Sequence, residues 1–236
     1  MKVAYVTGCD RGLGLALAKV LLSKGYKVFA GSFMPEWPDL GRLAEQEPDL
    51  TIVQVDVGSD KSVAHAAKTI RQHTDKIDIL INNAGIMKDR SGDIFGDLYF
   101  EDMIQLYNVN TLGALRVTNS VIDLLVNGDD KRLVNISSEA GSIADNWRTS
   151  LYGYCMSKTA LNMQGAILQR HLKDYGIKVM HFHPGWVRSY ITGKFDDHAD
   201  IDAMESATGI IHQVLLPQEI GHLPSYIDYT GKPLPW

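Results

Sequence analysis

The chain has 236 residues, a length that can hold one or two domains and that α/β folds routinely use for one. Hydrophobic residues make up 45% and charged residues 22%, which is ordinary globular composition and excludes a disordered chain. The net charge of −5, with Lys and Arg scattered along the chain, argues against a nucleic-acid partner.

Short β-branched and aromatic runs alternate with longer stretches of helical spacing. The runs predict buried strands over residues 2–7, 27–32, 51–56, 77–82, 132–137 and 178–183, with a seventh edge strand near 226–229. Helical spacing predicts helices over 12–23, 59–73, 100–126 and 153–174. This alternation predicts parallel pairing with right-handed crossovers. We therefore expect one domain over residues 1–236, an α/β doubly wound parallel sheet of about seven strands with helices on both faces.

A glycine-rich turn, Thr7 to Gly14, follows the first predicted strand and opens the first predicted helix. Glycine lets the backbone turn tightly and approach phosphates, whose charge is met by the N–H groups and the positive end of the helix. The spacing differs from the common G-x-G-x-x-G. On its own, the turn fits either a dinucleotide site or a tight turn without a ligand.

The second predicted strand ends at Ser32, and residues 30–33 contain no carboxylate that could bind the ribose hydroxyls of NAD. Ser32 can donate to a phosphate, and Arg11 supplies a cation beside the adenosine end, unless it is a solvated arginine at the helix start. These residues predict a preference for NADP(H) over NAD(H). Asp56 ends the third strand, where it can accept from an adenine amino group or cap the turn at Gly58.

Tyr154 and Lys158 are four residues apart, so on a helix they share one face. A tyrosine with a pKa near 10 is a poor proton donor or acceptor at neutral pH, but a nearby cation favours the phenolate and lowers the pKa. The pair can act as a tunable acid and base. Alone, this spacing is equally that of an ordinary surface pair.

Taken in order, these motifs resemble the standard branch of the short-chain dehydrogenase/reductase family, from residue 2 to about 189. The landmarks are the glycine turn, Asn82-Asn83-Ala84-Gly85, Asn108-Val109-Asn110, Asn135-Ile136-Ser137-Ser138, Tyr154 with Lys158, and Pro184-Gly185. Within the family the chain is similar to C-factor and sniffer-like carbonyl reductases through residues 142–146, 154–162 and 228–236. The resemblance implies a Rossmann-type NAD(P)-binding domain and an oxidoreductase that interconverts a carbonyl and an alcohol.

The resemblance also implies roles for four catalytic residues. Tyr154 would pass a proton to the substrate oxygen as hydride reaches the carbonyl carbon. Lys158 would lower the pKa of that tyrosine and hold the nicotinamide ribose. Ser138 would hydrogen-bond the carbonyl oxygen, and Asn110 would anchor a water in a proton relay. The residues expected against the cofactor are Gly8, Asp10, Arg11, Gly12, Leu13, Gly14, Ser32, Asp56, Val57, Asn83, Ala84, Gly85, Tyr154, Lys158, Pro184, Gly185, Val187 and Ser189.

The stretch between Ser138 and Tyr154 is longer than the family's usual gap. The longer loop leaves Ser137 as an alternative to Ser138. Tyr152 competes with Tyr154, but only Tyr154 has a lysine four residues on. This loop is where we expect the protein's own substrate specificity.

Other features predict where the protein works and what it binds. The apolar run at residues 3–6 is too short for a signal-peptide core, and no stretch of about 18 apolar residues occurs, so we expect a cytoplasmic protein that does not enter membranes. Two cysteines and the pair His181 and His183 lack metal-ligand spacing, so we expect no metal. The long apolar faces of 100–126 and 153–174, which relatives use to dimerise, predict a homodimer or homotetramer.

Two functions remain open on the sequence. The first is NADP(H)-dependent interconversion of a rather apolar aldehyde or ketone with its alcohol. The alternative is a dinucleotide-binding signalling or sensor protein with little turnover. Epimerase chemistry on nucleotide sugars would require the glycine spacing and the longer C-terminal region of extended relatives, which this sequence lacks.

Overall fold

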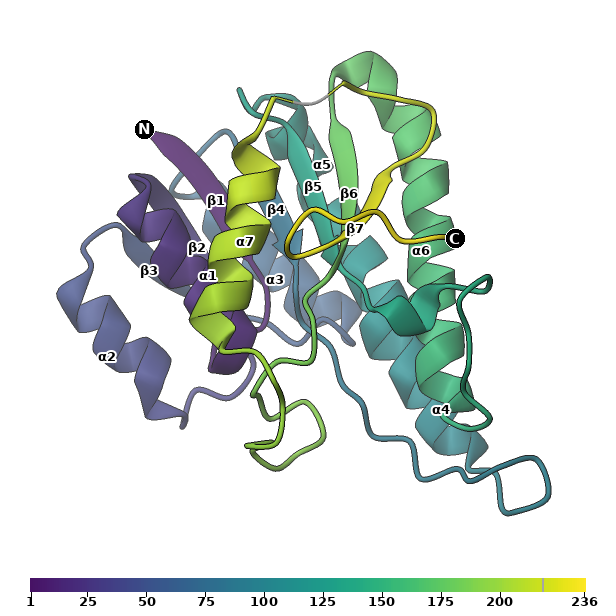
Figure 1. The fold of residues 1–236 in the computed structure, drawn as a ribbon. Helices are drawn as coiled ribbons and strands as arrows, with labels where there is room; N and C mark the ends of the chain where they lie inside the picture. The colour runs from purple at the N-terminus through teal and green to yellow at the C-terminus, as the bar shows by residue number, and fades with distance from the viewer. Residues whose placement is uncertain (218) are drawn as a thin grey trace.

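The computed structural model describes residues 1–217 and 219–236 and is built on one parallel sheet of seven strands (Figure 1). The strand order is β3-β2-β1-β4-β5-β6-β7, so the chain reverses direction across the sheet after β3. The strands are β1 Lys2–Val6, β2 Tyr26–Ser32, β3 Leu50–Gln54, β4 Ile79–Asn82, β5 Arg132–Ile136, β6 Lys178–His183 and β7 Ser225–Asp228. All adjacent pairs are parallel, which confirms the predicted doubly wound α/β sheet and its seventh edge strand.

Successive side chains of each strand point to opposite faces of the sheet, and helices cover both faces. Ala4 and Val6 pack with α1 and α7, whereas Val3 and Tyr5 pack with α3 and α5. The helices are α1 Gly12–Ser23, α2 Pro38–Gln46, α3 Asp60–Arg71, α4 Phe100–Leu106, α5 Ala114–Val126, α6 Tyr152–Leu172 and α7 Ala203–Leu215. Each face therefore has its own hydrophobic core.

The predicted helix over 100–126 is not a single α-helix. A π-helix, η1 over Tyr107–Gly113, lies between α4 and α5 and shifts the side chains by part of a turn. Single π-turns inside helices frequently mark functional sites, and this one carries Asn110. Two short 3₁₀ helices, η2 Glu139–Gly141 and η3 Lys173–Tyr175, complete the secondary structure.

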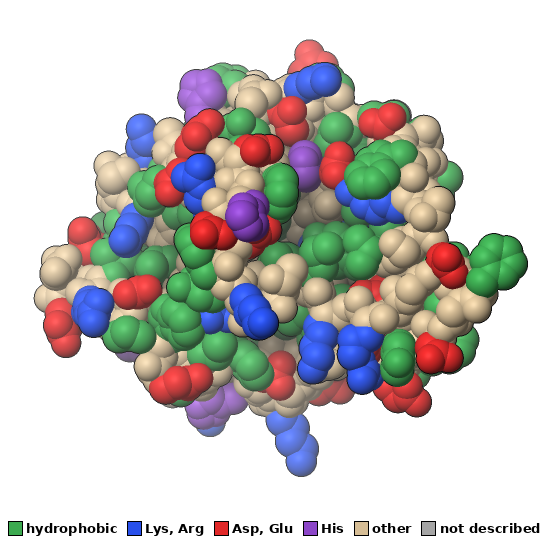
Figure 2. Space-filling view, turned by 60° about the horizontal axis from the view of Figure 1, so that its bottom comes forward, with side chains coloured by type: hydrophobic (Ala, Val, Ile, Leu, Met, Phe, Trp, Pro, Cys, Tyr) green, Lys and Arg blue, Asp and Glu red, His purple; other side chains and the backbone are tan. Residues whose placement is uncertain are grey.

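The carboxyl ends of the strands all meet at one edge of the sheet, which lies at the bottom of Figure 1. The glycine turn and the segments after β4, β5 and β6 lie there, as ligand-binding loops do in open α/β sheets. Figure 2 looks onto this edge and shows hydrophobic side chains gathered around a shallow hollow. Within residues 1–217 and 219–236, no helix has the length and hydropathy to cross a membrane.

Candidate active site

The glycine turn between β1 and α1 forms a cradle that side chains would fill. Gly8 and Gly12 have φ of +70° and +58°, the left-handed region that favours glycine. A Cβ on Gly14 would lie 2.0 Å from the Gly8 carbonyl oxygen. Arg11 is the N-cap of α1 and makes no side-chain capping bond, so the first N–H groups of that helix are left for a ligand. The cradle therefore fits a pyrophosphate.

Asn83 fixes the glycine turn from the neighbouring strand. Its side-chain amide donates to the carbonyls of Thr7 at 2.8 Å and Gly8 at 3.1 Å. The Thr7 hydroxyl accepts from the backbone N–H of Asn83 and Ala84, each at 3.1 Å. A Cβ on Gly8 would meet the Ala84 Cα at 2.9 Å, so the two segments touch through their backbones.

A carboxylate does occupy the tip of β2, which corrects the expectation drawn from residues 30–33. It belongs to Asp10 of the glycine turn, which is buried. Asp10 accepts the Ser32 hydroxyl at 2.6 Å and the backbone N–H groups of Phe33 at 3.0 Å and Met34 at 3.0 Å. The hydroxyl hydrogen of Ser32 is therefore already used in the hydrogen bond to Asp10. The sequence hid this contact because Asp10 and Ser32 are 22 residues apart.

Three other predicted cofactor residues make local capping or packing contacts. Asp56 accepts from the backbone N–H of Gly58 at 2.8 Å, the capping arrangement that was one of its two expected roles. Val57 is buried against Gly113, whose Cβ would come within 2.9 Å of it. Leu13 packs at the margin of the core beneath the glycine turn.

Tyr154, Ser138 and Lys158 converge where β5 ends beside α6. Ser138 lies near enough to the Tyr154 phenol to lower its pKa and accepts from the Ala140 backbone N–H at 3.1 Å. Lys158 Nζ donates to the Ile136 carbonyl at 2.8 Å and lies 5.8 Å from the centre of the Tyr154 ring. All three side chains are buried.

The two alternatives raised by the long loop lie elsewhere. Ser137 donates to Asn162 at 2.7 Å, so its hydroxyl is used in the core. Tyr152 lines a separate pocket on the outer side of α6. The geometry therefore brings Ser138 and Tyr154 together and keeps their competitors away from them.

Burial sets the pKa values of the two titratable groups. It raises the pKa of Tyr154 to about 12, although Ser138 acts in the opposite direction. It lowers the pKa of Lys158 to about 8, because an ammonium is poorly solvated there. From the sequence we expected a nearby cation to lower the pKa of Tyr154. In the structure desolvation is the largest influence on this pKa and raises it, while Ser138 and Arg148 act in the lowering direction.

Asn110 joins the segment after β4 to α6. Its side-chain oxygen accepts from the Ile86 N–H at 2.8 Å, and its amide donates to the Ile86 carbonyl at 2.9 Å and to the Ser157 hydroxyl at 3.1 Å. Gly85 lies between Asn110 and Lys158, since its Cβ would be 3.3 Å from the former side chain and 3.8 Å from the latter. The π-turn is what aims Asn110 into this position.

The segment after β6 folds back over the site. Gly185 has φ of +82°, and the Pro184 carbonyl accepts from Ser206 at 2.7 Å. Val187 pairs with Ile201 in an isolated bridge, which closes residues 187–201 into a loop.

This loop reaches two other parts of the site. A Cβ on Gly12 would lie 3.6 Å from Ser189, so the loop touches the glycine turn. The Ile191 carbonyl accepts from the Met87 N–H at 3.2 Å, so it also touches the segment after β4.

Sequence reasoning missed the carboxylate that caps the catalytic helix. Asp89 accepts from the backbone N–H of Gly153 at 2.9 Å and of Tyr154 at 3.3 Å. Leu151, the N-cap residue of α6, has a left-handed backbone with φ of +60° and makes no side-chain cap itself. A capping residue 64 positions away in the chain gives no local sequence signal.

A second missed contact fixes Ser138 from the far edge of the sheet. Tyr226 on β7 donates its hydroxyl to the Ser138 carbonyl at 2.6 Å. Its ring packs on Trp236 with 5.0 Å between centroids, and the Trp236 carbonyl accepts from Ala144 in the long loop at 3.0 Å. The C-terminal strand thereby supports the long loop as well as Ser138.

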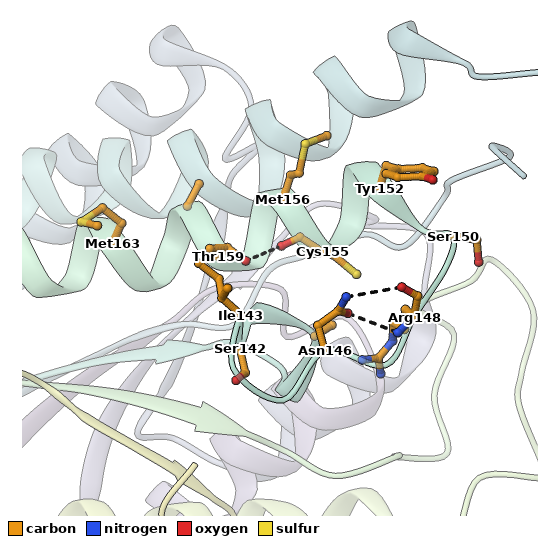
Figure 3. A pocket seen from close by; sticks show the side chains of 12 residues that line it. Ser142, Ile143, Asn146, Arg148, Ser150, Tyr152, Cys155, Met156, Thr159 and Met163 are labelled. Carbon is orange, nitrogen blue, oxygen red and sulfur yellow. Dashed lines mark hydrogen bonds between the residues drawn. The ribbon is translucent and has the colours of Figure 1, made fainter. Parts of the chain in front are cut away.

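A pocket of about 510 Å³ lies between the long loop and α6 (Figure 3). Cys155, Thr159 and Met163 line it from the helix, and Ile143 and Arg148 from the loop. The helical period turns Thr159 and Met163 away from the face that carries Tyr154 and Lys158, whereas Cys155 lies between the two faces. The pocket therefore lies mainly on another side of α6 and approaches the catalytic group at Ala140.

The histidines of β6 are packed in the structure. His181 is buried, its ring lies 6.1 Å from that of Trp236, and a Cβ on Gly165 would overlap it. Burial lowers the pKa of His181 to about 3. Within the described part of the chain, no three His, Cys, Asp or Glu side chains form a group that could hold a metal.

Comparison with known proteins adds a family to this geometry. Residues 2–200 match the short chain dehydrogenase family. The chain is 35% identical over 167 residues to the C-signal of Myxococcus xanthus, which covers 69% of this chain and 95% of that protein. It is 34% identical over 194 residues to human retinol dehydrogenase 5, covering 80% of this chain but only 57% of that protein.

Two solved structures resemble the whole chain. The NADPH-bound carbonyl reductase from chicken fatty liver superposes with a TM-score of 0.88 at 29% identity, with all of both chains covered. The carbonyl reductase Sniffer of D. melanogaster gives 0.87 at 26% identity, covering 100% of this chain and 99% of that one.

Proposed function

The chain belongs to the short chain dehydrogenase family of oxidoreductases, and we propose that it reduces an aldehyde or ketone with NADP(H), with Tyr154 as the proton donor. One observation carries the proposal. The buried Tyr154 phenol lies close enough to Ser138 for the serine to lower its pKa and lies beside a buried lysine, at the edge of the sheet where the glycine turn also opens. An acid next to a hydroxyl donor is what a carbonyl oxygen needs as it gains negative charge.

The chain's own residues would handle the proton and the orientation of the substrate. Because Ser138 Oγ accepts from the Ala140 N–H, its hydroxyl hydrogen is left as a donor, and it would turn from the Tyr154 oxygen to the carbonyl oxygen of the substrate. The Tyr154 hydroxyl would give its proton to the same oxygen.

The bound dinucleotide would supply the hydride. The free N–H groups at the start of α1 and the open backbone at Gly8, Gly12 and Gly14 would hold its pyrophosphate. Lys158, beside Gly85, would hold the nicotinamide ribose. Val187 and Ser189 would lie near the nicotinamide, in the loop that also touches Gly12.

We propose NADP(H) as the preferred cofactor because of Arg11. Its guanidinium carbon lies against two aromatic rings, and no side chain of the described residues accepts a hydrogen bond from it. A guanidinium with free N–H groups suits a phosphate monoester. The NADPH-bound structure of the chicken carbonyl reductase supports the same choice. The negative charge of Asp10 opposes the binding of a 2′-phosphate, but three donors already satisfy that carboxylate.

The test is NADPH oxidation with a panel of aldehydes and ketones of increasing apolar size. We expect turnover with at least one small or medium apolar carbonyl, and much weaker turnover with NADH. Absence of turnover across the panel, together with tight NADPH binding in calorimetry, would favour a sensor protein instead. That second candidate is kept because one relative is named a signal, the C-signal of Myxococcus xanthus.

A further inference from the structure

Three separate parts of the chain meet at the Arg11 side chain. Arg11 is the N-cap of α1, Trp37 precedes α2, and Tyr190 lies in the loop 187–201 after β6. The guanidinium carbon is 4.2 Å from the centre of the Trp37 ring and 4.3 Å from that of Tyr190. The rings are 5.1 Å apart at 69° to one another, so Arg11 lies in an aromatic corner.

This corner holds the guanidinium without using its donors. Aromatic faces attract a cation through the ring quadrupole but offer no acceptor to its N–H groups. Trp37 Nε1 donates to Asp39 at 3.0 Å, and Tyr190 also packs on Phe195 at 5.1 Å, so both rings are themselves anchored. Arg11 is thus pre-oriented, with its N–H groups unpaired among the residues that the structure describes. Such an arrangement suits a doubly charged oxyanion that accepts two hydrogen bonds at once.

We propose that Trp37 and Tyr190 are specificity-determining positioning residues that hold Arg11 for the 2′-phosphate of the adenosine ribose. The proposal rests on the proposed function, because it takes NADP(H) as the cofactor and Arg11 as the phosphate ligand. The new inference goes beyond the proposed function because it assigns the choice of cofactor partly to the loop 187–201.

The position of Tyr190 in that loop gives the proposal a second consequence. The next residue, Ile191, is bonded to Met87 across the site, and the Tyr190 carbonyl accepts from Gly193 at 2.8 Å. A phosphate that immobilises Arg11 would therefore also immobilise the ring of Tyr190 and the loop attached to it. Binding of the 2′-phosphate and closure of the loop would favour each other, as linkage requires.

The first experiment measures binding of two adenosine fragments by calorimetry. The ligands are 2′,5′-ADP, which carries the 2′-phosphate, and 5′-AMP, which lacks it. For Tyr190→Ala and Trp37→Ala we expect the preference for 2′,5′-ADP to fall by about 3- to 30-fold, the range that cation–π contacts support. Tyr190→Phe keeps the ring and should keep the preference. Phe95→Ala, which removes an aromatic ring that is 95% exposed and lies outside the aromatic corner, serves as the matched control.

The possible outcomes distinguish a failure of this inference from a failure of the proposed NADP(H) function. If Arg11→Met removes the preference while both alanine variants keep it, Arg11 binds the phosphate but the aromatic corner has no role, and the inference is overturned. Equal weakening of both fragments in the alanine variants would also overturn it, because that pattern means general damage to the site. If Arg11→Met itself leaves the preference unchanged, the proposed NADP(H) site is wrong.

Hydrogen exchange tests the link to the loop. Because 2′,5′-ADP has no nicotinamide, it can protect amides in residues 187–201 only from the adenosine side. We expect 2′,5′-ADP to protect this loop in the wild type and not in Tyr190→Ala, with 5′-AMP protecting it in neither. Equal protection by 2′,5′-ADP in the wild type and in Tyr190→Ala would contradict the link.

Discussion

Lys158 carries a buried charge whose only hydrogen bond in the structure's described residues is to the Ile136 carbonyl. Its pKa of about 8 means that folding disfavours the ammonium. Functional groups are often kept at such a cost to stability. The buried ammonium of Lys158 is therefore expected to cost stability at neutral pH.

We predict that Lys158→Met loses activity yet raises the free energy of unfolding at pH 7 by about 1–3 kcal/mol. In the wild type the unfolded lysine titrates near 10.5 and the folded one near 8, so stability should rise with pH between these values. The variant lacks this rise, and its advantage should shrink by pH 9.5. Urea unfolding at the two pH values measures this. The prediction would be contradicted if Lys158→Met were less stable than the wild type at pH 7. It would also be contradicted if the variant's gain in unfolding free energy were the same at both pH values.

Asp10 gives a second prediction at the same scale. Its carboxylate shares the tip of β2 with the proposed 2′-phosphate site, and two negative charges there repel. Asp10→Asn removes the charge while keeping one acceptor oxygen. We expect NADPH to bind several-fold more tightly relative to NADH, on the order of 1 kcal/mol. Calorimetry with both cofactors checks this, and an unchanged ratio would mean that Asp10 is too well shielded to matter.

The element that carries Tyr154 and Lys158, α6, depends on a cap from outside itself. Without Asp89 the first N–H groups of the helix lose their acceptor, next to the left-handed Leu151. We predict that Asp89→Ala lowers the free energy of unfolding by about 1–2 kcal/mol and kcat by about 10-fold through misplacement of Tyr154.

The conservative and control variants of Asp89 sharpen this test. Asp89→Asn keeps an acceptor and should retain most of the activity. Asp97→Ala changes an exposed carboxylate of the same segment and should leave both quantities unchanged. Denaturant unfolding and steady-state kinetics give the two readouts. Asp89→Ala with wild-type kcat would show that the cap has no catalytic consequence.

The elements that the sequence predicted are those with strong periodic signals. Seven strands and the helices α1, α3 and α6 lie close to their predicted ranges, because buried parallel strands are apolar throughout. Two helices, α2 and α7, were not predicted. The first is only nine residues long and starts at Pro38, and the second follows a polar segment and is capped by Asp202. The π-turn at Asn110 is too short to produce a hydrophobic pattern that the sequence could reveal.

The site was predictable where motifs are local and unpredictable where contacts are distant. Tyr154 and Lys158 share one helix, and the turn from Gly8 to Gly14 is continuous in the chain. The partners of Ser32 and Ser138, which are Asp10 and Tyr226, are brought in by the fold from far along the chain. The burial that raises the pKa of Tyr154 cannot be read from spacing alone.

For the molecule as a whole, we propose that residues 1–236 fold as a single domain and assemble into a homodimer or homotetramer. One sheet takes strands from the whole length of the chain. Helices α4 and α6 carry exposed hydrophobic side chains, with Ile104 69%, Met163 63% and Ile167 62% exposed. Light scattering should give at least twice the monomer mass, and Met163→Glu should lower it. A monomer mass for the wild type would refute the assembly.

The central claim is that Tyr154 gives the proton to the carbonyl oxygen, and the comparison of Tyr154→Phe with Tyr152→Phe tests it most directly. With a carbonyl that the wild type reduces, we predict that Tyr154→Phe loses about 10²- to 10⁴-fold in kcat/KM and keeps its affinity for NADPH. Tyr152→Phe, which changes a tyrosine of the separate pocket, should keep wild-type turnover. Full activity of Tyr154→Phe would contradict the mechanism.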